Sequence, residues 1–282
     1  MKSIIWFRND LRIDNNPALK AACENSKEVN AIFLYSQDQL KKHNEANVKL
    51  DFLIENLKCL SGRLKELNIS LSIMESLGFD KDSEIILKIV KERDIDKVFF
   101  NKQFGEDEQK RDKEVTTILK ASNVKVESFN DQIVYEAGSI RTGQDNPYSV
   151  FTPFKRKWVE NFDMEFLDIE HKYTPMNQEN SSSNISNFNF NFKIEHKVDM
   201  SFWPAGEKSA LNRLKDFLEN KASNYSKDRN DPIIDGTSRM SPYLALGVIS
   251  SKRCILEGLK LNNFEFNSGN NGITKWIDEI VW

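Results

Sequence analysis

The sequence predicts an α/β fold: an N-terminal doubly wound parallel sheet, followed by an incomplete all-helical region. Strand and helix patterns alternate as far as about residue 135, whereas only helical patterns occur after about residue 200. The last helical pattern is still strongly apolar where the sequence stops at Trp282. These three observations set the fold class, and the elements below are taken in chain order.

The first half of the chain reads as short buried strands separated by amphipathic helices. Strands are expected at residues 3–7, 29–35, 69–74, 97–100 and 124–129. Helices are expected from Pro17, with Asn15 or Asn16 as the cap, and at residues 50–67, 83–93 and 108–120. Such alternation favours a parallel sheet covered by helices on both faces, so we assign residues 1–135 to one domain.

The second half predicts helices only. Residues 136–200 are expected to be a connecting helix at 151–162 and an Asn- and Ser-rich linker, and residues 201–282 a helical domain. Helices are expected at residues 207–220, 248–261 and 272–282, and another beginning at Pro242 with Ser241 as its cap.

The end of the sequence suggests that chain is missing. Trp276, Ile280 and Trp282 would lie near one face of the last helix, with nothing after them to cover that face. A large exposed apolar stripe at the end of a chain predicts a C-terminal truncation.

Composition limits the function classes. A formal net charge of −3 does not by itself indicate a nucleic-acid binder, so any contact with DNA requires a local basic patch. Three scattered cysteines, no signal peptide and no apolar stretch long enough for a membrane span favour a cytoplasmic protein. The sequence contains no glycine-rich nucleotide loop and no metal-ligand spacing, so we expect no metal site.

The segment from Thr237 to Ser241 concentrates polar groups in front of a helix. Thr237, Ser238 and Ser241 supply hydroxyls and Arg239 supplies a guanidinium, which are groups that bind phosphate. The alternative is an ordinary helix cap with Arg239 in solvent, and the local chemistry alone favours that alternative.

Four segments resemble the photolyase/cryptochrome family, and most closely the bacterial class I cyclobutane pyrimidine dimer photolyases. They are IIWFRNDLRIDNNPAL, VFTPFKRKW, DGTSRMSPYLALGVIS and the closing WIDEIVW, and they occur in the family's order. The resemblance implies a Rossmann-like antenna domain, a helical FAD-binding domain and two chromophores. It also implies light-driven electron transfer to damaged DNA.

The resemblance also assigns roles to individual residues. Matches to FAD-contacting positions are Tyr225, Thr237, Ser238, Arg239, Met240, Ser241 and Trp276. Arg229 matches a contact to DNA phosphate, Glu279 a carboxyl that hydrogen-bonds the flipped lesion, and Trp282 an indole that stacks on it. Glu279 and Trp282 are therefore the expected catalytic residues.

The physics of a pyrimidine dimer agrees with these assignments. The dimer stacks poorly in the duplex, so flipping it out costs less than flipping a normal base; photolyases are a standard example of base flipping. Glu279 and Trp282 are three residues apart and lie on one helical face. The structural alternative for Trp276 and Trp282 is plain core packing.

Two further segments have open interpretations. Lys155, Arg156 and Lys157 could form a phosphate-contacting rim with Lys227 and Arg229, or simply a solvated helix face.

The segment that follows the strand at 97–100 resembles the part of the antenna domain that holds a folate, here methenyltetrahydrofolate. Asp107 and Glu108 fall on the pterin-contacting positions and His43 is a further candidate, although Asp107 departs from the family's usual Asn. The alternative is an acidic helix start that is stabilised by the helix dipole without any ligand.

Three functions follow. The first is light-dependent repair, in which a monomeric deoxyribodipyrimidine photo-lyase splits cyclobutane dimers in damaged DNA with an electron from reduced FAD. The second is a cryptochrome-like blue-light photoreceptor, against which Glu279 and Trp282 argue. The third is an inactive fragment, which would bind FAD weakly or not at all.

Overall fold

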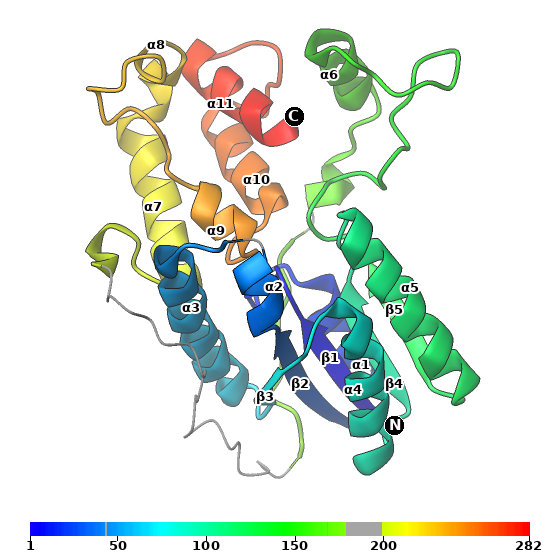
Figure 1. Cartoon of the computed structure of the whole chain (residues 1–282). Helices are drawn as coiled ribbons and strands as arrows, with labels where there is room; N and C mark the ends of the chain where they lie inside the picture. The colour runs from blue at the N-terminus through cyan, green and yellow to red at the C-terminus, as the bar shows by residue number, and fades with distance from the viewer. Residues whose placement is uncertain (43, 168, 179–198) are drawn as a thin grey trace. The chain divides into compact units, whose positions relative to one another are not determined.

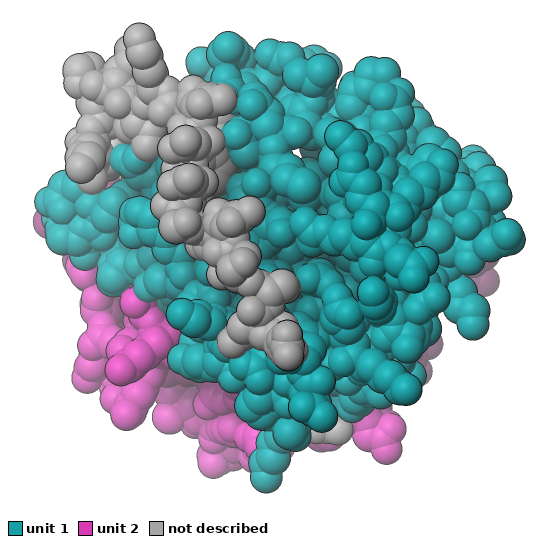
Figure 2. Space-filling model, turned by 90° about the horizontal axis from the view of Figure 1, so that it is seen from below, with its two compact units in different colours: residues 1–131, 171–206 teal, residues 132–170, 207–282 magenta. Residues whose placement is uncertain are grey.

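The computed structural model describes residues 1–42, 44–167, 169–178 and 199–282, and these form two compact units (Figure 2). The first, here the α/β unit, contains Met1–Asp131 and the described part of His171–Gly206. The second, the helical unit, contains Gln132–Glu170 and Glu207–Trp282. The expected connecting segment at 136–200 is therefore divided between the two units. His43 and most of the expected linker lie outside the described residues.

The α/β unit is built on a five-stranded parallel sheet in the order β3-β2-β1-β4-β5 (Figure 1). The strands are β1 Lys2–Phe7, β2 Glu28–Tyr35, β3 Ser70–Glu75, β4 Lys97–Asn101 and β5 Lys125–Phe129. The helices are α1 Pro17–Asn25, α2 Gln37–Lys42, α3 Asn47–Glu66, α4 Phe79–Glu92 and α5 Glu106–Ala121. The predicted doubly wound α/β fold is confirmed.

Alternation along the strands buries both faces of this sheet. Ile4 and Trp6 of β1 belong to a core cluster with apolar residues of α4 and α5. Ile5 and Phe7 are equally buried and point to the opposite face, on which α1 and α3 pack. Near-continuous apolar strands are what a sheet covered on both faces requires.

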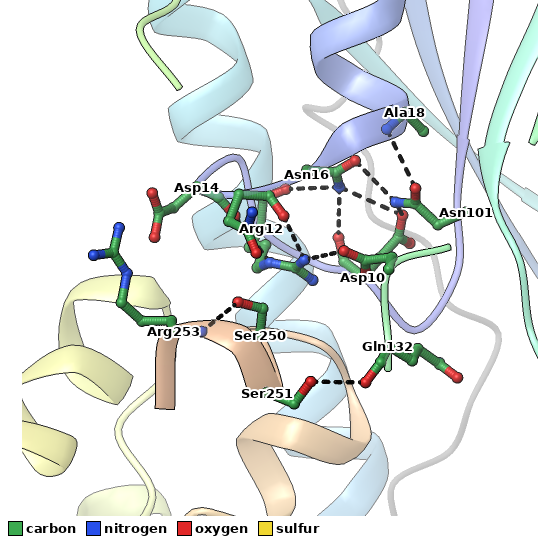
Figure 3. Close-up of polar contacts among 12 residues, drawn as sticks. Asp10, Arg12, Asp14, Asn16, Ala18, Asn101, Gln132, Ser250, Ser251 and Arg253 are labelled. Carbon is green, nitrogen blue, oxygen red and sulfur yellow. Dashed lines mark hydrogen bonds and ion pairs between the residues drawn. The ribbon is translucent and has the colours of Figure 1, made fainter. Parts of the chain in front are cut away.

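The loop that follows β1 is fixed by buried polar side chains (Figure 3). Asn16 caps α1, accepting a hydrogen bond from the Leu19 amide at 3.0 Å. Asn101, at the end of β4, donates to Asp10 at 2.7 Å and to Asn16 at 2.9 Å. Arg12 pairs with the equally buried Asp131. Part of the family-like opening segment therefore acts as a structural connection between two strand ends.

The helical unit is described by itself. Its elements are α6 Phe151–Glu160, η1 Met164–Leu167, α7 Glu207–Asn220, η4 Ala222–Asn224, α8 Tyr225–Asp228, α9 Ser241–Ala245, α10 Ser251–Leu261 and α11 Asn271–Val281. A short helix, η3 Met200–Phe202, belongs to the α/β unit. Because Ser250 accepts a hydrogen bond from the Arg253 amide at 3.0 Å, α10 begins after Ser250 (Figure 3) and not at Val248 as expected.

Candidate cofactor and DNA-binding site

Tyr225 and Trp276 form part of the core of the helical unit. Trp276 is 1% exposed, and its ring centroid lies 5.2 Å from that of Phe217 on α7. Tyr225 packs edge-on against the same phenylalanine at 5.7 Å, and burial raises the pKa of its hydroxyl. A Cβ at Gly258 of α10 would lie only 3.1 Å from the Trp276 ring, so the two helices pack closely. The contacts of Trp276 in this structure are those of a core residue, which was the alternative to its role at the FAD.

The run from Thr237 to Ser241 has an unusual backbone and free hydroxyls. Arg239 has a φ of +51°, the left-handed region that non-glycine residues rarely adopt. Met240 is buried, whereas Thr237 and Ser241 are exposed. Within the described residues the Thr237, Ser238 and Ser241 side chains make no hydrogen bond. These hydroxyls remain available to a ligand.

The expected cap of α9 is wrong. Ser241 is the first helical residue and Met240 occupies the cap position, without a side-chain cap hydrogen bond. Met240 already has φ −83° and ψ −15°, which are helical angles, whereas a capping side chain normally requires an extended backbone.

Asp235 organises the cations beside this run. Its two carboxylate oxygens contact Lys221 Nζ at 2.9 Å and Arg239 Nη2 at 2.7 Å. The hydrogen bond from Lys221 is the main cause of a lowered pKa of Asp235. Asp235 was not expected from the sequence as part of the site. The four-residue spacing between Asp235 and Arg239 was the available signal.

Arg229 and Glu279 meet although 50 residues separate them in the sequence. Arg229 follows α8 and donates through Nη1 to Oε1 of Glu279 on α11. The guanidinium also lies 5.3 Å from the ring centroid of Tyr225. The hydrogen bond to Glu279 raises the pKa of Arg229. The structure thus brings together one expected phosphate contact and one expected lesion contact.

Trp282 presents most of its surface to solvent. It is 63% exposed and contacts the edges of Phe151 and Phe154 on α6, with centroid distances of 5.3 and 5.5 Å. It also borders a cavity of about 210 Å³ in the helical unit, together with Tyr135, Trp158 and other residues. The described residues therefore do not enclose Trp282, in contrast to Trp276.

The basic triplet Lys155–Lys157 on α6 is, as a whole, neither a phosphate-contacting rim nor a solvated helix face. Lys155 is largely buried, forms an ion pair with Asp278 at 2.6 Å and donates to the carbonyl of Phe266 at 3.0 Å. Lys157 pairs with Glu160 at 3.1 Å. Lys155 thus joins α6 to α11, and only the exposed Arg156 lacks a partner within the described residues.

Asp107 and Glu108 lie in the first turn of α5, in the α/β unit. Asp107 is exposed and Glu108 half-buried, with its carboxylate folded back against Gly105 before the helix. Three acidic residues in a first turn are favourable to the helix dipole even without a ligand.

The described ranges contain neither a cluster of metal ligands nor a membrane-spanning helix. No group of three or more His, Cys, Asp or Glu side chains in residues 1–42, 44–167, 169–178 and 199–282 is placed to hold a metal ion. In the same ranges, no helix has the length and apolar character needed to span a membrane.

Known proteins resemble the chain along its whole length. The DNA photolyase family model matches residues 3–176. A deoxyribodipyrimidine photo-lyase of Buchnera aphidicola from Acyrthosiphon pisum is 32% identical over 289 residues, and one of Escherichia coli is 30% identical over 280 residues. These alignments cover 100% and 99% of this chain, respectively, and 58% of each relative. The chain therefore spans less than two thirds of their length.

Solved structures give the same result. A bacterial class III photolyase from Agrobacterium tumefaciens has a TM-score of 0.79 and 26% identity, covering 100% of this chain and 57% of that one. A Synechocystis cryptochrome also has a TM-score of 0.79, at 18% identity, covering 100% of this chain and 59% of that one, and shows a similar fold. The family match covers more than half of the sequence, and the chain belongs to the DNA photolyase family.

Proposed function

We propose that this chain takes part in light-dependent repair of cyclobutane pyrimidine dimers, as a carbon–carbon lyase that uses FAD. The supporting observation is the convergence of Arg229 with Glu279 in a member of the photolyase family. Trp282, one helical turn from Glu279, offers a largely exposed indole. Base-flipping enzymes require such a combination of a cation for phosphate, a polar group for the base edge and a flat stacking surface.

The residues present fit the phosphate end of FAD. The hydroxyls of Thr237, Ser238 and Ser241 are unpaired within the described residues. Asp235, two residues before Thr237, pairs with both Lys221 and Arg239. We assign the FAD phosphates to this run. The tightly packed Trp276 offers no open face to a flavin ring, so a role for it at the ring requires rearrangement or additional chain.

The chain's own residues account for lesion binding. Arg229 would neutralise a backbone phosphate next to the dimer. The Glu279 carboxylate would accept a hydrogen bond from the flipped pyrimidine, and Trp282 would stack on it. When bound, reduced FAD supplies the light-excited electron that opens the dimer.

We further propose a methenyltetrahydrofolate antenna at Asp107 and Glu108, on the resemblance alone, since the helix dipole also accounts for acidic residues in the first turn of α5. The structure of an archaeal photolyase from Sulfolobus tokodaii contains two FAD molecules, with the implication of a novel light-harvesting cofactor in that protein. A monomer in the cytoplasm is the proposed state. Cys23, Cys59 and Cys254 are not joined in a disulfide, which agrees with a reducing compartment.

A repair assay separates the three functions. The purified 282-residue chain is reconstituted with FAD, reduced, and illuminated with blue light in the presence of a duplex that contains one thymine dimer. Loss of the dimer, and its persistence with Glu279→Gln, supports repair. Flavin retention without repair favours the photoreceptor, and neither retention nor repair favours an inactive fragment.

A further inference from the structure

Arg229 is assigned to a DNA phosphate and Glu279 to the flipped lesion. In the protein without DNA, these two side chains form an ion pair with each other. Arg229 Nη1 donates directly to Glu279 Oε1. A phosphate that takes the guanidinium removes the main partner of the carboxylate. A DNA contact that uses Arg229 Nη1 or Glu279 Oε1 therefore competes with the pair.

When Arg229 binds a phosphate instead, Glu279 keeps only a distant cation as a partner among the described residues. Lys275 Nζ lies 3.7 Å from the same oxygen, at the limit of an ion pair. On the other side, Arg229 already rests over the Tyr225 ring at 5.3 Å. The two side chains are 28% and 40% exposed, so DNA can reach the pair directly.

We propose that the Arg229–Glu279 ion pair discriminates against undamaged DNA, an inference that rests on the proposed function. Undamaged DNA, with its bases stacked, can engage Arg229 through a phosphate but brings no hydrogen-bond donor to Glu279. A flipped dimer brings the N3–H of a pyrimidine, which a carboxylate accepts. The loss of the ion pair is thus compensated only when a lesion is present, and specificity arises from a penalty on the wrong ligand.

The expected size of this penalty is modest because the pair is partly exposed. Exposed ion pairs contribute little to stability, and breaking one changes a dissociation constant by about two- to fivefold. An effect of that size adds to the larger contribution of stacking and leaves the protein able to search undamaged DNA.

The test measures DNA affinity in the dark by fluorescence anisotropy, using one duplex with a single thymine dimer and the same duplex undamaged. Glu279→Gln should tighten binding to undamaged DNA about two- to fivefold, since Arg229 is free to bind phosphate. The slope of log affinity against log salt should steepen by about one phosphate contact. In an Arg229→Gln background the gain from Glu279→Gln should disappear.

Glu219→Gln is the matched control, because it removes the same charge from an exposed carboxylate that pairs with Lys215 on α7. An equal gain from Glu219→Gln and Glu279→Gln overturns the inference, since net charge alone then accounts for it. Equal wild-type affinity for the two duplexes overturns the proposed function. In that case, a gain in affinity for undamaged DNA that is specific to Glu279→Gln still supports the competition between Glu279 and phosphate for Arg229. The absence of that gain overturns the competition as well. Failure of all variants to bind either duplex overturns both.

Discussion

The α/β unit and the helical unit both carry segments typical of photolyases, but their polar side chains have different partners. In the α/β unit Asp10, Asn16 and Asn101 are at most 3% exposed and bond to one another. In the helical unit the Thr237 and Ser238 hydroxyls have no partner within the described residues. Resemblance to a family motif therefore has two meanings: buried, satisfied groups hold the fold, and accessible, unsatisfied groups await a ligand.

The largest expected effect contrasts Trp276 of α11 with Trp282, the residue that follows α11. Trp276→Ala removes a fully buried ring beside Phe217 and should lower the free energy of unfolding by about 3–5 kcal/mol. Trp282→Ala removes a mostly exposed ring and should lower it by less than about 1 kcal/mol. Urea denaturation of both variants measures the difference, and similar losses would show that Trp282 is also a core residue.

Breaking the buried network of the α/β unit should be the next most damaging change. Asn101→Ala removes the hydrogen bonds that this buried residue makes with Asp10, Asn16 and the Ala18 amide. Unsatisfied buried groups predict a loss of about 3 kcal/mol in urea denaturation. Asn267→Ala, in an exposed loop of the helical unit, is the control and should change stability by less than about 0.5 kcal/mol. Equal effects would contradict the proposed distinction between the units.

Asp82 allows the α/β unit to be tested by pH. Burial raises the pKa of its carboxyl to about 6 in the folded protein, from 3.8 when exposed. Because the folded state retains the proton longer, this group makes stability fall as the pH rises from about 4 to about 6, with no further change above. A shift of this size corresponds to at most about 3 kcal/mol.

Asp82→Asn should therefore stabilise the protein at pH 7 by about 1–2 kcal/mol, less than the full amount because the contact with Arg111 at 4.0 Å is weakened. The neutral amide keeps the shape and can still accept from Ser76. Urea denaturation at pH 4 to 8 measures the effect. A pH profile parallel to that of the wild type would contradict the raised pKa.

The smallest effect on stability is expected at the phosphate-binding run. Ser238→Ala removes a hydroxyl without a partner and should change the free energy of unfolding by less than about 0.5 kcal/mol. FAD affinity, measured by quenching of flavin fluorescence, should nevertheless fall. A large loss of stability with unchanged FAD affinity would assign Ser238 to the fold.

The regular elements of the fold could be predicted from the sequence because local patterns decide them. The five strands and α7 follow from apolar periodicity, and Asn16 follows from its position before Pro17. The short helices α2 and α8 could not be predicted, since six and four residues carry too little periodicity. Ser241 was assigned wrongly because the left-handed Arg239 shifts the helix start by one residue.

The candidate site could be predicted only as a set of residues and not as a set of contacts. From the sequence, Lys155 was either a phosphate contact or a solvated cation, but in the structure it pairs with Asp278, more than 100 residues away. The Arg229–Glu279 pair likewise depends on how α8 packs against α11. Helical periodicity could not distinguish Trp276 from Trp282, because their exposure depends on α6 and α7, which lie elsewhere in the chain.

The most direct test is whether the exposed indole of Trp282 recognises damaged DNA. In the dark, wild-type protein should bind a thymine-dimer duplex about tenfold or more tightly than the undamaged duplex, and Trp282→Ala should lose most of that preference. Leu261→Ala, which removes another exposed apolar side chain from the helical unit, should keep it. Equal binding of both duplexes by the wild type, or an unchanged preference in Trp282→Ala, would contradict the account.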